Sequence, residues 1–166
     1  MKEILVNEEG YIQFFNELDN LTSSLTSNAA HGSEVYGDAV GDGWHDNFAY
    51  EDAMRQEKMI QNKINKMLSQ KENLKLIDDT KYDDNVVCIN DSIEILLKYD
   101  DGSEELDVVK LTGKYLPDDD LNEISLNSPI GKAIYNMGIG SDVIYEVSNK
   151  KIELHIIRKV ILNETN

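Results

Sequence analysis

The chain has 166 residues, 40% of them hydrophobic and 29% charged, with a formal net charge of -16 at pH 7. Its length suits one ordinary domain, or a small domain with an extended element. The acidic balance excludes coating of duplex nucleic acid and docking on an anionic membrane, because both need clustered lysine and arginine. The single cysteine, Cys88, excludes an internal disulfide, and we expect it to be buried in a strand. With no signal-peptide pattern and no apolar run near ~20 residues, we expect a cytoplasmic protein.

The charge is spread unevenly along the chain. Residues 3–54 contain eleven acids and no lysine or arginine, whereas both signs are mixed from Arg55 onward. This pattern is typical of a solvated acidic surface, or of a local negative field that suits a cation or a basic cavity.

Two apolar seams predict a pair of long helices. The first seam steps by three and four residues through Tyr11, Phe14, Leu18, Leu21 and Leu25. The second is formed in the same way by Tyr50, Ala53, Glu57, Ile60, Ile64, Met67, Lys71 and Leu74. Asn7 is the expected N-cap of the first helix. Because each stripe needs a partner to cover it, we predict an antiparallel coiled-coil hairpin over residues 1–77, with arms of ~45 Å.

Glycines mark the turn of this hairpin. Gly32, Gly37, Gly41 and Gly43 lie between the seams, and each glycine costs a helix interior ~1 kcal/mol relative to alanine. We therefore place the tip near residues 41–47 and expect the first helix to fray before it.

The second half of the chain changes to the period of two that is typical of strands. Alternating residues from Ile93 to Tyr99, and again from Val143 to Ile156, indicate an antiparallel sheet. Turns are expected at Asp101–Gly102 and at Ser148–Lys150. One short helix is predicted between the strands, with Ser128 as its cap and Pro129 at its first position. Residues 78–166 are thus expected to form an α+β domain, joined through a linker at 74–85; residues 118–120 are interpreted as a second, solvated linker.

The predicted tip contains the residues best suited to chemistry. Asp42 and Asp46 lie four residues apart, and Mg²⁺ takes oxygen ligands that often include only one or two protein carboxylates. Such a tip would hold a cation jointly with a partner rather than alone. Trp44, the only tryptophan, either contacts a partner or folds back onto the hairpin. His45 has no zinc-like spacing to the other histidines.

Two stretches of the second half form a specific motif, residues 124–134, ISLNSPIGKAI, and residues 140–143, GSDV. They closely resemble the C-terminal signature of the Gre transcription elongation factors, which cleave transcripts together with RNA polymerase. Residues 7–11 with 17–18 are similar to the opening of the family's first helix. Gly41–Asp42, followed by Asp46–Asn47 and Tyr50, is similar to its acidic tip.

This resemblance implies a fold, a partner and a function. The C-terminal block implies an FKBP-like domain that docks on RNA polymerase, for which we expect Ser128 and Pro129 to be contact residues. The hairpin would enter the secondary channel and approach the RNA 3′ end. Asp42 and Asp46 would help to hold a second Mg²⁺, so that the polymerase cleaves backtracked RNA. Asn47 and Tyr50 would shape the tip, and we expect both of them, with Trp44, to contact the partner. The chain would not be an enzyme by itself.

Departures from the family pattern keep a second interpretation open. The family tip has an aspartate three residues before a glutamate, whereas here two aspartates are four apart. The first helix also lacks the basic residues that the family places beside the tip. The alternative is a channel-binding regulator that does not stimulate cleavage. A peptidyl-prolyl isomerase is suggested only by fold analogy.

Overall fold

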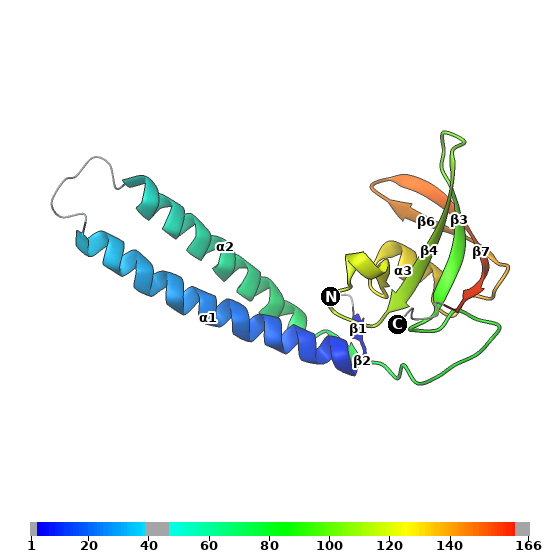
Figure 1. Cartoon of the computed structure of the whole chain (residues 1–166), viewed down its shortest axis with the longest axis horizontal. Helices are drawn as coiled ribbons and strands as arrows, with labels where there is room; N and C mark the ends of the chain where they lie inside the picture. Colours follow the sequence, from blue (N-terminus) through cyan, green and yellow to red (C-terminus); the bar gives the residue numbers. More distant parts are fainter. Residues whose placement is uncertain (1–2, 39–46, 162–166) are drawn as a thin grey trace. The chain divides into compact units, whose positions relative to one another are not determined.

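The computed structural model describes residues 3–38 and 47–161 of the chain. These residues form two compact units (Figure 1). One unit comprises Phe14–Leu74, and the other combines Glu3–Gln13 with the chain from Lys75 onward. The predicted division into residues 1–77 and 78–166 differs in its placement of residues 3–13 and of residues 75–77. Residues 3–13 join the second unit because their backbone and side chains bond to residues from Lys75 onward, as described below.

The first unit is a helical hairpin. Helix α1 (Glu8–Asp38) and helix α2 (Asn47–Lys71) run side by side in opposite directions (Figure 1). The predicted seams face inward: Phe14, Ile64 and Met67 are buried, and the leucines of the first seam are half-buried. Tyr11 and the polar seam positions Glu57 and Lys71 are exposed instead. The helix α1 continues through Gly32 and Gly37, so the glycines do not end it where fraying was expected.

Two polar contacts also join the helices. The Lys63 ammonium lies 2.6 Å from the Glu17 carboxylate. The Lys71 ammonium lies 5.4 Å from the centre of the Phe15 ring, within the range of a cation–π contact. Both contacts are partly exposed and each contributes at most about 1 kcal/mol, so the apolar seam contributes most to the pairing.

The second unit is built on a five-stranded sheet with the order β5-β4-β3-β7-β6. Its strands are β3 (Ser92–Lys98), β4 (Glu104–Thr112), β5 (Glu123–Ser125), β6 (Asp142–Val147) and β7 (Lys150–Val160). All neighbours are antiparallel except β4 and β5, which are parallel. The helix α3 (Pro129–Ile134) lies between β5 and β6 in the chain. The predicted α+β class is confirmed, with a mixed rather than a purely antiparallel sheet.

Both predicted turns connect neighbouring strands. Gly102 joins β3 to β4 with a φ of 82°, a left-handed value that favours glycine. Ser148 and Asn149 join β6 to β7, both with positive φ, and they form the two-residue turn whose twist matches antiparallel strands.

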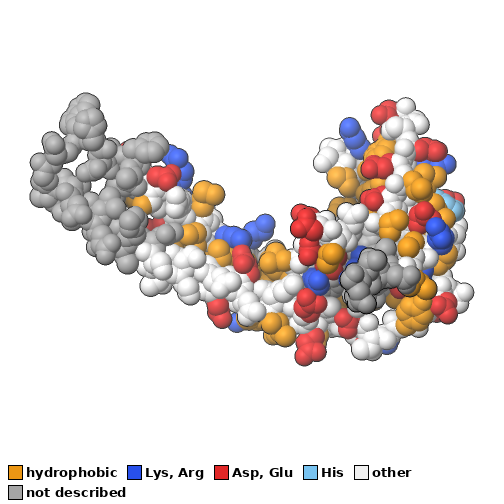
Figure 2. All heavy atoms as spheres, viewed as in Figure 1, with side chains coloured by type: hydrophobic (Ala, Val, Ile, Leu, Met, Phe, Trp, Pro, Cys, Tyr) orange, Lys and Arg blue, Asp and Glu red, His pale blue; other side chains and the backbone are white. Residues whose placement is uncertain are grey.

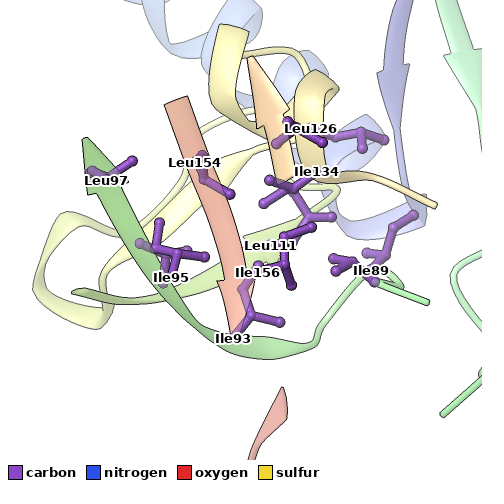
Figure 3. Close-up of a cluster of buried hydrophobic side chains, with 12 residues drawn as sticks. Ile89, Ile93, Ile95, Leu97, Leu111, Leu126, Ile134, Leu154 and Ile156 are labelled. Carbon is purple, nitrogen blue, oxygen red and sulfur yellow. The ribbon is translucent and has the colours of Figure 1, made fainter. Parts of the chain in front are cut away.

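The inner side chains of the sheet and α3 form one hydrophobic core (Figure 3). Ile93, Ile95 and Leu97 of β3 lie next to Leu154 and Ile156 of β7 in this cluster. The cluster is completed by residues of β4, β6, the α3 region and the segment before β3: Val87, Ile89, Val109, Leu111, Leu126, Ile134 and Val143. Strand alternation therefore accounts for most of the core.

Three details differ from the sequence expectations. Cys88 is buried, as expected, but it lies in an irregular segment rather than in a strand. The predicted linker begins with strand β2 (Leu74–Leu76), which pairs with β1 (Ile4–Val6). The acidic run at 118–120 leads into a short 3-10 helix, η2 (Asp119–Leu121), whose N-cap Asp118 accepts a hydrogen bond from the Asp120 N–H.

Candidate functional site

The predicted tip lies between the two helices in sequence. Helix α1 ends at Asp38 and α2 begins at Asn47. Asp42, Trp44 and Asp46 lie outside the described residues, so their metal-holding and contact roles remain predictions. Tyr50 lies in the first turn of α2 by its backbone. Among the described residues, no group of three or more His, Cys, Asp or Glu side chains could hold a metal.

The other predicted contact residues, Ser128 and Pro129, begin helix α3. The Ser128 hydroxyl accepts a hydrogen bond from the Gly131 N–H at 3.0 Å and donates one to the Ser125 carbonyl at 2.7 Å. Pro129 occupies the first turn, where its missing N–H costs nothing, and is exposed. The predicted cap is therefore confirmed, and the exposed proline is accessible on the second unit. Contact of either residue with a partner remains a prediction.

Two neighbours fix this cap in place. Gly131 lies so close to the Ser125 carbonyl that an added Cβ would collide with the oxygen. Asn127 connects the turn to strand β1, because its side chain accepts from the Leu5 N–H at 2.9 Å and donates to the Leu5 carbonyl at 2.7 Å. The Lys132 ammonium donates to the Asn127 carbonyl at 2.5 Å. Sequence reasoning assigned no role to Asn127, although it directly precedes the cap in the most specific stretch of the resemblance.

The start of α1 is held equally firmly within the second unit. The Asn7 side chain accepts from the Gly10 N–H at 2.8 Å, which confirms the predicted N-cap. Its amide donates to Asp79 at 2.8 Å, and its backbone N–H donates to the Gly113 carbonyl at 2.9 Å. Gly10 lies against the Gly113 backbone, with no room for a Cβ. This helix start therefore depends on residues more than seventy positions away.

A buried acid lies at the β4–β5 end of the sheet. The Glu123 side chain is fully buried and lies 3.0 Å from the Lys114 ammonium and 3.3 Å from that of Lys110. It also accepts from the Asp118 N–H at 3.0 Å. Burial alone would raise the pKa of Glu123, but this hydrogen bond and the two lysines outweigh it and lower the pKa. Sequence reasoning missed this cluster, because its members are separated by loops.

The surface of the sheet unit carries both charge signs. Figure 2 shows acidic, basic and hydrophobic side chains interspersed on its visible face. No described helix has both the length and the apolar character that crossing a membrane requires. This surface, with the exposed Pro129 at α3, suits binding to another protein better than coating a polyanion.

The two units together define a class of protein: an α+β chain with a long antiparallel helical hairpin and a mixed sheet that carries one short capped helix. No family model matches the chain. The chain is 29% identical over 137 residues to transcription elongation factor GreA of Clostridioides difficile, covering 80% of each sequence. It is 26% identical over 155 residues to GreA of Chlorobium phaeobacteroides, covering 92% of each.

A solved structure is similar as well. The alignment with the crystal structure of the GreA factor homolog 1 (Gfh1) protein of Thermus thermophilus covers 96% of this chain and 99% of that chain, with 18% sequence identity and a TM-score of 0.43. The curated relatives confirm the resemblance to the Gre family of transcription elongation factors over most of the chain. They support a role in transcription elongation.

Proposed function

We propose that this chain binds RNA polymerase through its secondary channel and stimulates cleavage of backtracked RNA. It would act on the polymerase's own active site rather than as an enzyme alone. The observation that carries the proposal is similarity to GreA over 80% or more of the chain, combined with a hairpin whose connecting segment contains Asp42 and Asp46. We expect the protein to work in the cytoplasm, where the polymerase is.

The hairpin is suited to reaching into a narrow channel. Helix α1 has 31 residues, which corresponds to ~46 Å at 1.5 Å per residue. Its inward seam is apolar, and the described part of α1 carries acids and no lysine or arginine. A long, thin arm with one acidic helix favours entry into a basic cavity.

The proposed Mg²⁺ fits the donor chemistry of the two aspartates. Carboxylate oxygens are ligands that Mg²⁺ prefers, and two carboxylates leave most of its six positions to water, substrate or a partner. The ion would therefore be held jointly with the polymerase. When bound, it supplies activation of water and neutralisation of phosphate charge. The role of Asp42 and Asp46 is to orient and retain it.

The test is cleavage in a reconstituted, backtracked RNA polymerase complex. We expect the wild-type chain to speed release of the 3′ fragment. In the double variant Asp42→Ala, Asp46→Ala this acceleration should be at least about tenfold smaller. The matched control removes two carboxylates elsewhere on the hairpin, with Asp19→Ala and Glu57→Ala, both exposed. The control variant should retain the acceleration. Equal loss in both variants would show that net charge matters rather than the tip.

The altered tip favours one alternative. The spacing of four residues and the shorter second acid place the carboxylates differently from the family pattern. A chain that occupies the channel without promoting cleavage would compete with a cleavage-active factor. In that case the wild type would bind the complex but leave cleavage unchanged or slower, and replacement of both aspartates would leave its binding intact.

A further inference from the structure

The two edge strands of the sheet differ in length and in how many of their backbone groups form hydrogen bonds. Strand β5 is three residues long, and its neighbouring turn uses the Ser125 carbonyl for bonds to the Ser128 N–H and hydroxyl. Strand β6 has six residues and forms the other edge. Natural sheets usually blunt or cover such an edge, because its unpaired amides are a template for another strand.

The register identifies which backbone groups of β6 are unpaired. The Ile156 N–H donates to the Ser141 carbonyl at 3.0 Å, so Asp142 and His155 face each other as a pair that is not hydrogen-bonded. Antiparallel ladders alternate, so Val143, Tyr145 and Val147 bond to β7. The N–H and C=O groups of the remaining residues, 142, 144 and 146, therefore point away from the sheet.

Within the described part of the chain, no other element bonds to these outward groups. The backbone hydrogen bonds between described loops, turns and strands include none from Asp142, Ile144 or Glu146. The side chains of the same residues are exposed: Ile144 is 65% exposed and the Asp142 side chain 85%. One Asp142 carboxylate oxygen lies 2.7 Å from His155 Nδ1 on β7, and the exposure of the side chain leaves the carboxylate accessible to a further basic group. The exposed edge of β6 therefore presents three outward N–H and C=O pairs, together with one apolar side chain between two acidic ones.

A second copy of this chain fits the edge poorly. If the β6 strands of two copies paired antiparallel with their exposed side chains on the same face, Ile144 of one copy would lie opposite Ile144 of the other. Asp142 of each copy would then lie opposite Glu146 of the other. Like charges directly opposite each other are destabilising, and each copy carries a net charge of -16. A strand with basic residues opposite the two acids would have the complementary pattern.

We propose that β6 is a docking edge for an extended segment of another protein, in which two basic residues flank an apolar one at alternate positions. The segment would add a sixth strand next to β6. Its backbone would bond to residues 142, 144 and 146, its apolar side chain would cover Ile144, and its basic side chains would face Asp142 and Glu146. Strand addition of this kind takes its affinity from main-chain bonds and its specificity from alternate side chains.

The probe is a blocked seven-residue peptide with lysine at its second and sixth positions, valine at its fourth and threonine elsewhere. Added to the full ¹⁵N-labelled chain, it should shift the amide signals of Asp142, Ile144 and Glu146 and slow their hydrogen exchange. The amides of Val143 and Tyr145 already bond to β7 and are an internal control, since their exchange should change little.

Three substitutions distinguish docking of a partner strand from the alternative that the acids only keep other strands from pairing with β6. Glu146→Lys should weaken peptide binding at least about tenfold, whereas Asp120→Lys, an equal charge change at η2, should leave it unchanged. Ile144→Pro removes the central outward N–H and keeps the β7 ladder, so binding should be lost while the dispersed spectrum remains. A peptide with glutamates in place of the lysines should bind Glu146→Lys better than the wild type.

Specific outcomes overturn the proposal. If the lysine peptide leaves the three amides unchanged at millimolar concentration, or if the glutamate peptide binds the wild type equally well, the acids only protect the edge from pairing. If sedimentation shows concentration-dependent self-association that Ile144→Pro abolishes, the occupant is a second copy rather than a basic partner.

Discussion

The hairpin unit and the sheet unit bury their apolar side chains in different ways. Among the described side chains of the hairpin, Phe14, Ile64 and Met67 are buried along one seam. The sheet unit instead closes a continuous cluster around Ile93, Leu111 and other residues of several strands and α3. A seam is held by contacts that repeat along two helices, whereas a closed core depends on strands that are distant in sequence. We therefore expect core damage to spread through the sheet unit and seam damage to stay local.

The largest effect should follow from a cavity in the sheet core. Leu154 on β7 is 1% exposed, and Leu154→Ala should lower the free energy of unfolding of the sheet unit by about 2–5 kcal/mol. Chemical denaturation followed by near-UV circular dichroism and NMR of the sheet residues gives the value. Leu106→Ala is the control, because Leu106 is 60% exposed on the same sheet and its truncation should cost less than about 0.5 kcal/mol.

Truncation within the seam should cost less. Met67 is 2% exposed, and Met67→Ala should destabilise the hairpin by about 2–3 kcal/mol, since two helices can close partly over the gap. Met59→Ala on the same helix is matched in chemistry, and it should be close to neutral because Met59 is 66% exposed. Far-UV circular dichroism on heating measures both. If Met67→Ala also shifts the NMR signals of the sheet core, the two units are not independent.

The next largest loss of stability should follow from filling the space where Gly131 lies close to the Ser125 backbone. Gly131→Ala places a methyl group against the Ser125 carbonyl and should destabilise the sheet unit by about 1–3 kcal/mol. The matched change is Gly138→Ala, whose new Cβ would meet the Ser141 hydroxyl at 3.3 Å and the Asn85 carbonyl at 3.8 Å, with no collision. Urea midpoints of the two variants settle the comparison. Equal midpoints would show that the α3 turn yields easily.

The smallest effect concerns the buried acid, and it depends on pH. Glu123→Gln should cost about 1–2 kcal/mol at neutral pH, since both lysines retain access to water. The pKa of Glu123 in the folded protein is below its ordinary value of 4.5. Its contribution is therefore fully present above pH 4.5 and is lost as the pH falls through the lower folded value. Unfolding curves of wild type and variant should converge in acid. A constant difference across that range would contradict this account.

Local rules predicted most of the hairpin and the turns. The seam spacing anticipated the buried Phe14, Ile64 and Met67, and Asn7 was identified as the cap. Glycine propensity misled at Gly32 and Gly37, because a cost of ~1 kcal/mol per glycine does not by itself end a long helix, in which each added residue contributes a backbone hydrogen bond.

Features made by distant residues were missed. The parallel pairing of β5 with β4 and the short strands β1 and β2 have too few residues to show an alternating pattern. The Glu123 cluster likewise depends on loops that bring Lys110 and Lys114 to one carboxylate. Of the candidate site, the cap at Ser128 and Pro129 was predictable from residue type, whereas its bonds through Asn127 to strand β1 were not.

The grouping of residues 3–13 with the sheet unit affects the order in which the chain can fold during synthesis. The Leu5–Asn127 hydrogen bonds span 122 positions, so the first strand must wait for the ribosome to deliver the α3 turn. The hairpin, complete by Leu74, can pair while translation continues. Long-range closure is slow compared with local helix pairing. The nascent protein therefore carries a paired helical arm from Phe14 to Leu74 before the unit that contains residues 3–13 is assembled.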